Sequence, residues 1–323
     1  MSNREIVAEN LVKRYNGNVT AVNDVSFRVK SGEIFGFLGP NGAGKSTTVA
    51  MLTTLIVPTE GKATVGGYDV VSAAGEVRRI AGVALQEIGL DPLMKSMELL
   101  TIQAQMFGLN RRQAQERARD LLDLVKLSDV TDRRVGKYSG GMRRRLDLAL
   151  ALAHEPAILF LDEPTTGLDP ASRRDIWNEV RRLNKQLGMT IFLTTQYLEE
   201  ADELADRVAI INNGGIAVEG TPADLKAGLG AESINVTFRE TDDAERARSE
   251  LAGMAERAQV DRKTLRLYLS RAAESVPAVV NRLGQTGLEP VSLTLTQPTL
   301  DDVFLHFTGQ RFSAEDMPEA EVA

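Results

Sequence analysis

The sequence feature that most constrains the fold is the segment 39–47, which reads Gly-Pro-Asn-Gly-Ala-Gly-Lys-Ser-Thr. An apolar run at 34–38 precedes it and another at 49–52 follows it, as in a strand–loop–helix unit. In that context the pattern G-x-x-x-x-G-K-[ST] predicts a phosphate-binding loop. Glycine lets backbone N–H groups approach an anion, and the N-terminus of the following helix attracts negative charge. The segment therefore predicts binding of a nucleoside triphosphate.

Two side chains of this loop carry specific predictions. Lys45 supplies a cation for the terminal phosphates, and the Ser46 hydroxyl is a predicted Mg²⁺ ligand. The alternative, a glycine-rich turn with a surface lysine, is disfavoured by the spacing and the flanking runs. The predicted nucleotide-binding residues of the loop are Gly39, Pro40, Asn41, Gly42, Ala43, Gly44, Lys45, Ser46 and Thr47.

Composition narrows the remaining choices. A chain of 323 residues is longer than one hydrophobic core usually supports, which favours two domains. The sequence contains no cysteine and two histidines, which excludes disulfides and thiolate zinc sites and disfavours a histidine-rich metal centre. Residues 231–323 hold 10 Lys+Arg and 16 Asp+Glu, so −6 of the net charge of −7 lies there. Neither part has the basic balance of a nucleic-acid binder.

Membrane-related signals are also informative. Residues 1–10 lack the apolar core of a signal peptide, and no apolar stretch approaches the roughly 20 residues needed to cross a bilayer. We therefore expect any connection to a membrane to depend on a partner protein.

Tyr15 and Gln86 lie next to predicted strands and are candidates for contact with the nucleotide. Residues 6–29 are expected to form β-structure with a turn at 13–17, where Tyr15 is a candidate stacking surface for adenine. The alternative for Tyr15 is a tyrosine that packs the turn. Gln86 ends the apolar run 80–85, where its amide can reach Mg²⁺ or an attacking water; the alternative is an ordinary polar strand end.

The middle of the chain contains a second predicted anion site. Residues 94–126 have helical periodicity, with arginines on a face most simply exposed to solvent. Ser139-Gly140-Gly141-Met142 then begins another helix, with Ser139 as its N-cap. Free N–H groups, small residues and a hydroxyl suit a phosphate, yet one chain rarely needs two such sites for one triphosphate. The second site is therefore expected to serve a nucleotide held by another copy.

Carboxylates follow the next buried strand. The apolar run 157–161 ends at Asp162 and Glu163. Asp162 is predicted to hold Mg²⁺ through water, and Glu163 is predicted to orient or deprotonate the water that attacks the γ-phosphate. A tight turn then exposes Asp169. A second buried strand, 189–195, ends at Gln196.

Together, these residues resemble the nucleotide-binding subunit of an ATP-binding cassette (ABC) transporter, over about residues 4–222. The resemblance implies an α/β fold: a P-loop NTPase cassette with a RecA-like mixed sheet, spanning 4–225, and a helical subdomain at about 94–150. It also implies ATP and Mg²⁺ as cofactors and two cassettes paired head to tail, most simply as a homodimer. In such a pair, the ATP on the loop of one copy is also contacted by residues of the other copy, namely Ser139, Gly140, Gly141, Met142 and Asp169. The resemblance further implies that the metal is bound by Ser46, Gln86 and Asp162, and that Glu163 and Gln196 act in catalysis.

Two departures from the family pattern bear on turnover. The signature usually reads Leu-Ser-Gly-Gly-Gln, but here Tyr138 and Met142 occupy its ends, and Met142 cannot donate a hydrogen bond as glutamine does. The switch position is usually histidine, whereas Gln196 cannot become cationic. These departures, and the ending Pro298–Leu305, resemble the drug-export branch typified by daunorubicin-resistance ATP-binding proteins.

The C-terminal part has its own pattern. Alternating apolar residues and two amphipathic stretches give the order β-α-β-β-α-β, which predicts a small α+β split-βαβ domain at 231–308. It contains no catalytic grouping, so regulation or dimer contact is the expected role. The acidic segment 309–323 is predicted to be a disordered tail.

The leading functional hypothesis is an ATP-hydrolysing subunit at the cytoplasmic face of the cell membrane, energising export of a drug-like or lipophilic compound through a separate membrane-spanning permease. A soluble ABC ATPase acting on ribosomes or DNA is the alternative, although such proteins usually carry two cassettes or a long coiled-coil insertion. A GTPase would need Asn-Lys-x-Asp, and the only Asn-Lys, at 184–185, continues with Gln-Leu. Adenine is therefore favoured over guanine.

Overall fold

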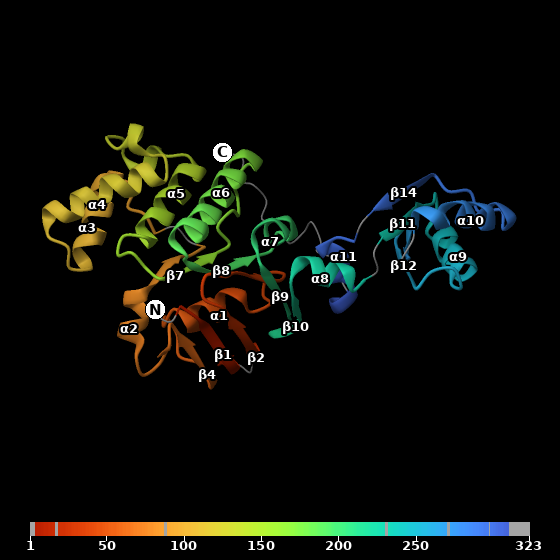
Figure 1. Cartoon of the computed structure of the whole chain (residues 1–323), viewed down its shortest axis with the longest axis horizontal. Coiled ribbons are helices and arrows are strands. Elements are labelled where there is room, and N and C mark those ends of the chain that lie inside the picture. Colours follow the sequence, from red (N-terminus) through yellow and green to blue (C-terminus); the bar gives the residue numbers. More distant parts are fainter. Residues whose placement is uncertain are drawn as a thin grey trace. The chain divides into compact units, whose positions relative to one another are not determined.

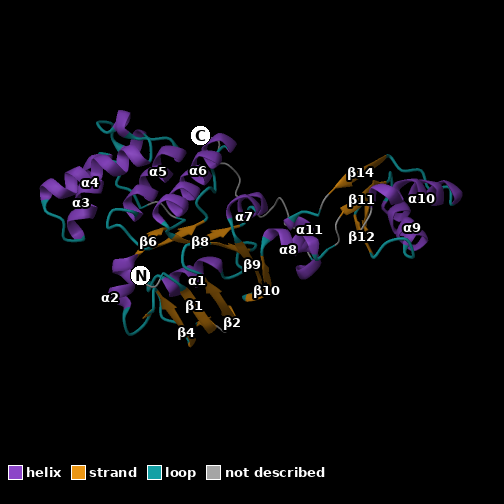
Figure 2. Cartoon of the chain, in the orientation of Figure 1, coloured by secondary structure: helices purple, strands orange, loops and turns teal. Residues whose placement is uncertain are grey.

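The computed structural model of the chain describes residues 4–16, 19–86, 89–229, 232–269, 272–296 and 298–309. Backbone contacts divide the chain into a first compact unit up to Gly220 and a second that begins at Thr221. The predicted tail at 309–323 lies outside the described residues, apart from Gly309. Figure 2 shows that the first unit combines sheets with helices, as the predicted α/β class requires.

A six-stranded mixed sheet forms the centre of the first unit. Five of its strands are parallel, and β10 is antiparallel to its neighbour β9. In sheet order the strands are β10 (Gly215–Gly220), β9 (Arg207–Asn212), β3 (Ile34–Leu38), β8 (Thr190–Thr195), β7 (Ile158–Asp162) and β6 (Ala81–Ala84). The central strands are buried on both faces, which explains why β3, β7 and β8 contain uninterrupted apolar runs rather than alternating residues.

A four-stranded antiparallel sheet lies against one face of the six-stranded sheet, with helix α1 (Lys45–Leu52) packed between the two (Figure 1). The strands of this second sheet, in order, are β2 (Val19–Val29), β1 (Ile6–Tyr15), β4 (Glu60–Val65) and β5 (Tyr68–Asp69). Phe160 and Phe192 point into this layer, whereas Leu159 and Leu161, the alternate residues of β7, point to the opposite face.

Helices cover that opposite face (Figure 1). The helices of the first unit are α1, α2 (Ala74–Ile80), α3 (Ser96–Met106), α4 (Arg111–Leu124), the 3₁₀ turns η1 (Ser128–Val130) and η2 (Val135–Lys137), α5 (Gly140–Ala151), α6 (Pro170–Leu187) and α7 (Leu198–Leu204). Helices α3, α4 and α5 contact one another, and α5 also contacts β6. Helix α5 therefore joins the helical layer to the edge of the central sheet.

Two local predictions need correction. The predicted helix at 94–126 is two helices, because Gly108 takes a left-handed conformation (φ +94°) and Asn110 caps α4 by accepting a hydrogen bond from the Gln113 N–H. The predicted turn at 13–17 is also shorter than expected. Tyr15 is the last residue of β1 and pairs with Val19 of β2, because the ladder continues past Lys13 after a shift in register.

The second unit contains the predicted β-α-β-β-α-β order. Its antiparallel sheet has the order β12-β13-β11-β14, with an apolar core between the sheet and its two long helices. The elements of the unit are α8 (Pro222–Ala227), β11 (Glu232–Thr237), α9 (Thr241–Leu251), β12 (Arg257–Asp261), β13 (Thr264–Leu269), α10 (Ala272–Gln285), β14 (Ser292–Thr296) and α11 (Leu300–Thr308). Because α8 belongs to this unit, the first unit ends before the predicted cassette boundary at 225.

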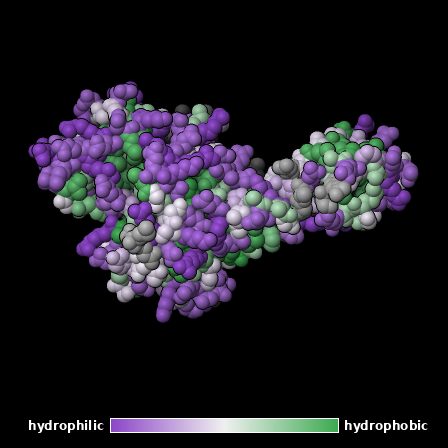
Figure 3. Space-filling model, viewed as in Figure 1, coloured by the Kyte–Doolittle hydropathy of each residue, from purple (hydrophilic) through white to green (hydrophobic). Residues whose placement is uncertain are grey.

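The surface of the first unit is mostly hydrophilic on the face shown in Figure 3, including the region of α4. The apolar stripe of α4 is buried, and its arginines lie largely on the outer face. Among the described helices, none has the length and apolar character required of a membrane span.

Candidate nucleotide-binding and hydrolysis site

The segment 39–47 forms the loop between β3 and the first turn of α1. Gly44 has φ +105°, and a Cβ there would lie 2.4 Å from the carbonyl oxygen of Ala21. A Cβ on Gly39 would lie 2.4 Å from the carbonyl oxygen of Ile211. No larger residue fits either position without moving the backbone, because both contacts are with main-chain atoms. The loop is therefore held tightly between neighbouring strands, with the N-terminus of α1 at its end.

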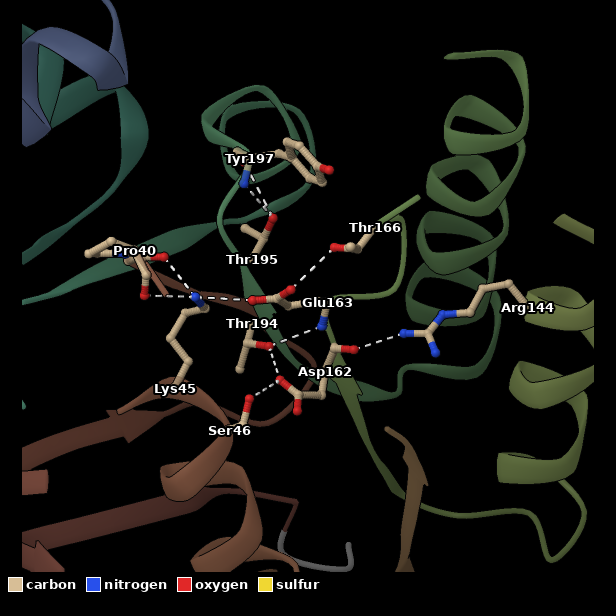
Figure 4. Close-up of polar contacts among 11 residues, drawn as sticks. Pro40, Lys45, Ser46, Arg144, Asp162, Glu163, Thr166, Thr194, Thr195 and Tyr197 are labelled. Atoms are coloured by element: carbon tan, nitrogen blue, oxygen red, sulfur yellow. Dashed lines mark hydrogen bonds and ion pairs between the residues drawn. The ribbon is translucent and has the colours of Figure 1, made fainter. Parts of the chain in front are cut away.

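Lys45 is nearly fully buried, with 4% of its surface exposed, and its ammonium group is held by three oxygen atoms. Its Nζ donates to the carbonyl oxygens of Gly39 (2.8 Å) and Pro40 (3.1 Å) and lies 3.1 Å from Oε1 of Glu163 (Figure 4). A buried ammonium group requires such partners, because desolvation of an unpaired charge is costly. The contacts place the cation between the loop and the end of β7.

Ser46 and Asp162 bring two hard oxygen donors together. The Ser46 hydroxyl donates to Oδ1 of Asp162 over 3.3 Å, and the Thr194 hydroxyl of β8 donates to the same oxygen. Hydroxyl and carboxylate oxygens are the donor types that Mg²⁺ prefers, and Mg²⁺ commonly takes its remaining ligands from water and substrate phosphates. The donor set at this position therefore fits Mg²⁺.

Glu163 follows β7 in an uncommon backbone conformation. Its φ is +49°, and its N–H donates to both the carbonyl and the hydroxyl oxygen of Thr194, each over 3.1 Å. Oε2 accepts a hydrogen bond from the Thr166 hydroxyl (3.2 Å), while Oε1 faces Lys45 (Figure 4). A non-glycine residue with positive φ costs of order 1–3 kcal/mol and persists where neighbouring contacts fix it. The end of β7 thus directs the Glu163 carboxylate at Lys45 of the phosphate-binding loop, beside the Asp162 carboxylate at Ser46.

A cleft of about 650 Å³ opens over this arrangement. The predicted site residues that line it are Tyr15, Pro40, Asn41, Gly42, Gly44, Lys45, Ser46, Thr47, Gln86, Glu163 and Gln196. Gly39, Ala43 and Asp162 lie behind this lining and support it. Val19 and Ala21 also line the cleft but were not predicted, since their residue types carry no chemical signal.

Three further predicted side chains of the cleft come from the ends of three separate strands. Gln196 follows β8 and is buried, and its Oε1 has no hydrogen-bond partner within the described part of the chain. A buried amide oxygen of this kind calls for a partner in the cleft. Tyr15 at the end of β1 is 44% exposed, and the Lys13 ammonium lies 5.3 Å from the centre of its ring. Gln86 follows β6 and is exposed.

The structure does not bring the other five predicted residues to this cleft. Ser139 caps α5 by accepting from the Met142 N–H (3.3 Å), and Ser139 and Gly140 are exposed. Asp169 caps α6, and hydrogen bonds from the Ser172 hydroxyl and backbone lower the pKa of its carboxyl. A Cβ on Gly141 would lie 2.9 Å from the Ser172 hydroxyl, so the starts of α5 and α6 adjoin. These residues therefore lie at a second place outside the cleft, where Ser139, Gly140 and Asp169 are exposed and Gly141 is buried.

Arg144 is a buried residue of the site that the sequence reasoning missed. Only 5% of it is exposed, and its guanidinium group donates to the carbonyl oxygens of Leu85, Asp162 and Pro164. It also pairs with Asp147 one turn along α5 (3.2 Å). Burial lowers the pKa of Arg144. Leu148, four residues further along the helix, is buried, so helical periodicity offered a signal that this arginine faces inward.

Glu200 on α7 is a second missed residue. It is fully buried, and its Oε1 accepts hydrogen bonds from the Thr165 hydroxyl and the Trp177 indole N–H, each over 2.9 Å. Burial raises the pKa of its carboxyl. These bonds link the turn after Glu163 to helices α6 and α7.

Asp147 provides a prediction of pH dependence. Burial raises the pKa of its carboxyl from 3.8 to about 6, against the opposing effect of Arg144. The folded protein therefore binds this proton more tightly than the unfolded chain, so the contribution of Asp147 to the free energy of unfolding falls as the pH rises from about 4 to about 6. We expect the free energy of unfolding of Asp147→Asn, relative to the wild type, to increase by about 1 kcal/mol between pH ~5 and pH ~7.5. Denaturant titrations at both pH values measure this difference, and parallel pH profiles would contradict it.

Comparison with protein families gives two matches. The family model described as "ABC transporter" matches residues 22–166. The model described as "ATP-binding protein DrrA1-3-like, C-terminal domain" matches residues 220–308.

Curated relatives match over almost their whole length. A daunorubicin resistance ATP-binding protein of Streptomyces coeruleorubidus is 42% identical over 96% of this chain and 97% of that protein. A linearmycin resistance ATP-binding protein of Bacillus subtilis is 36% identical over 94% of this chain and 98% of that protein. Nod factor export ATP-binding protein I of Burkholderia lata is 39% identical over 93% of this chain and 96% of that protein.

Solved structures agree with these matches. A dimeric bacterial ABC transporter cassette, 25% identical, superimposes with a TM-score of 0.62 over 67% of this chain and 98% of that chain. Another ATP-binding subunit of an ABC transporter, 27% identical, gives a TM-score of 0.62 over 69% of this chain and 92% of that chain. Taken with the geometry of the loop and the two carboxylates, these findings show that the chain is an ATPase that belongs to the ATP-binding subunits of ABC transporters, in the branch of the daunorubicin-resistance ATP-binding proteins.

Proposed function

We propose that two copies of this chain bind Mg²⁺ and ATP head to tail and that hydrolysis drives export of a drug-like or lipophilic compound through a separate membrane-spanning permease. The observation that carries the proposal is the division of the predicted site into two surfaces. Lys45 and Glu163 meet in the cleft, whereas Ser139 and Gly140 lie exposed outside it. A second copy is the simplest way to bring both surfaces to one triphosphate.

Each residue of the cleft has a role in this proposal. Lys45 neutralises the terminal phosphates, and the N-terminus of α1 and the loop N–H groups bind their oxygens. Glu163 orients and deprotonates the attacking water, and Gln196 contacts the γ-phosphate through its buried amide. Tyr15 offers an exposed ring on which adenine stacks.

Mg²⁺ is assigned to Ser46 and Asp162, with Gln86 approaching from the end of β6. The ion supplies positive charge that offsets the charge developing on the phosphate oxygens. Two hydrogen bonds hold Asp162 in place. The Thr194 hydroxyl donates to its carboxylate, and the Arg144 guanidinium donates to its main-chain carbonyl oxygen (2.8 Å).

The proposed docking site for a loop of the permease is a groove of about 470 Å³ beside Gln86. Apolar side chains from β6, from the segment between β6 and α3, and from α5 line the groove, among them Val83, Leu85, Leu90 and Leu150. Because Leu85 adjoins Gln86, a permease loop seated there contacts the residue that reaches the nucleotide. In this proposal the chain is bound at the cytoplasmic face of the membrane through its partner.

The class of compound follows the relatives, whose names record daunorubicin resistance, linearmycin resistance and Nod factor export. These names give no support to the alternative of an ATPase acting on ribosomes or DNA. Daunorubicin, the compound in the name of the 42% identical relative, is therefore the first probe.

The test is to isolate the tagged chain from membranes, identify the integral protein that copurifies, and prepare inside-out vesicles containing both. We expect ATP-dependent accumulation of daunorubicin in these vesicles and none when the chain carries Glu163→Gln. Recovery of the chain with ribosomes, or with no integral protein, would contradict the proposed partner. Vesicles that hydrolyse ATP without accumulating the drug would contradict the proposed substrate alone.

A further inference from the structure

We propose that Arg144 is a positioning residue that ties the signature end of helix α5 to the hydrolytic carboxylates of the same copy. The inference rests on the proposed head-to-tail pairing, and it concerns how one copy coordinates its two surfaces. When Ser139 contacts the nucleotide bound by the partner copy, the start of α5 shifts. Arg144 transmits this shift to Asp162 and Glu163, which act on the nucleotide bound by the same copy.

The contacts of Arg144 reach two chain segments that end at the cleft, one after β6 and one after β7. Nη1 donates to the carbonyl oxygen of Leu85 (2.6 Å), the residue before Gln86. Nη2 donates to the carbonyl oxygen of Asp162 (2.8 Å; Figure 4). Nε donates to the carbonyl oxygen of Pro164 (2.8 Å), so the two contacts flank Glu163. A planar guanidinium group with donors in a fixed fork can hold three carbonyl groups at once, and a compact ammonium group cannot reproduce that geometry.

The burial of Arg144 shows that this arrangement is specific. A buried cation is tolerated only when its donors are satisfied, and here three carbonyl oxygens and Asp147 satisfy it. All three carbonyl groups belong to the main chain, so the bonds fix the backbone of the strand ends rather than a side chain. Movement of Arg144 therefore moves the backbone that carries the carboxylates.

Helix α5 connects Arg144 to the exposed residues Ser139 and Gly140 at the start of the helix. Ser139 caps the helix, and Arg144 lies just over one turn further along the same rigid element. The first turn of α5 cannot shift toward a nucleotide on another copy unless Arg144 shifts or its bonds to the strand ends break. A helix with a buried, three-way anchor is thus a physical connection between the two surfaces.

Mixed dimers allow a direct test. Lys45→Ala inactivates the loop of one copy, and Ser139→Arg blocks the signature of the other; the exposed position of Ser139 accommodates the larger side chain in the free chain. Each variant alone has no complete site, but a mixed dimer has one complete site, formed by the loop of the Ser139→Arg copy and the signature of the Lys45→Ala copy. Its ATPase activity is the baseline.

Arg144→Lys is then added to one copy at a time. We expect either placement to lower kcat of the mixed dimer by about 10- to 100-fold with little change in KM for ATP, because misplacement of catalytic groups costs that much. The matched control is Arg112→Lys on α4, where the side chain is 86% exposed, and we expect it to leave kcat unchanged. Arg144→Gln is measured in parallel, and thermal melting of each chain verifies folding.

The outcomes separate the inference from the proposal beneath it. The inference requires that Arg144→Lys lowers activity in either copy. If activity fell in only one placement, whether in the copy with the intact loop or in the copy with the intact signature, Arg144 would support only that surface and the inference would be overturned. Unchanged activity in both placements would overturn it as well. An inactive baseline dimer would instead overturn the head-to-tail pairing.

Discussion

Replacement of Glu163 by glutamine is expected to lower kcat for ATP hydrolysis by about 10²- to 10⁴-fold, which is the usual contribution of a positioned general base. The amide cannot accept the proton of the attacking water, yet it has nearly the same shape and can still accept a hydrogen bond from Thr166. The positive φ at position 163 and the bonds from its N–H to Thr194 do not depend on the carboxylate. ATP binding is therefore expected to persist, as measured by equilibrium titration beside steady-state turnover.

Glu199→Gln is the matched control for this change. Glu199 lies exposed on α7, so the same loss of a charge is expected to leave hydrolysis unchanged. Normal turnover by Glu163→Gln would remove Glu163 from the role of base.

Replacement of Lys45 by alanine is expected to abolish measurable ATP binding. The change removes the only cation that contacts both the loop carbonyl groups and Glu163 among the described residues. It also leaves the buried Glu163 carboxylate without its ionic partner, so a negative charge stands where the γ-phosphate is expected. Isothermal titration of the variant with ATP in the presence of Mg²⁺ measures the loss.

Lys185→Ala, which removes an exposed lysine from α6, is the control for a general effect of charge. Melting curves establish that the Lys45→Ala chain remains folded. If that variant bound ATP with wild-type affinity, the assignment of the loop at 39–47 would be wrong.

The parts of the site that could be predicted are those in which neighbouring residues determine the outcome. The loop at 39–47 takes its shape from its own glycines, and the Ser139 cap depends on residues three positions away. The buried strand 158–162 was readable because a strand covered on both faces must be apolar throughout. The order of the C-terminal elements followed from short alternating runs in the same way.

The parts that could not be predicted depend on contacts between distant segments. Arg144 appeared as one arginine in a run of three. Helical periodicity could indicate that it faces inward, but its partners Leu85 and Asp162 are distant in the sequence and could not be predicted from it. Glu200 appeared as one acid in an acidic helix, yet Thr165 and Trp177 reach it from other elements. Tyr15 was placed in a turn because the register shifts of β1 that extend its ladder with β2 have no local signature.

The bond between Trp177 and Glu200 has a practical consequence. The sequence contains a single tryptophan, and its indole N–H is bonded to the carboxylate that also holds Thr165, two residues after Glu163. Tryptophan fluorescence of the unlabelled wild-type protein thus originates from one indole beside the hydrolytic turn. Any rearrangement of that turn during the ATP cycle alters the emission of this one indole, so stopped-flow fluorimetry can follow the cycle without an added dye.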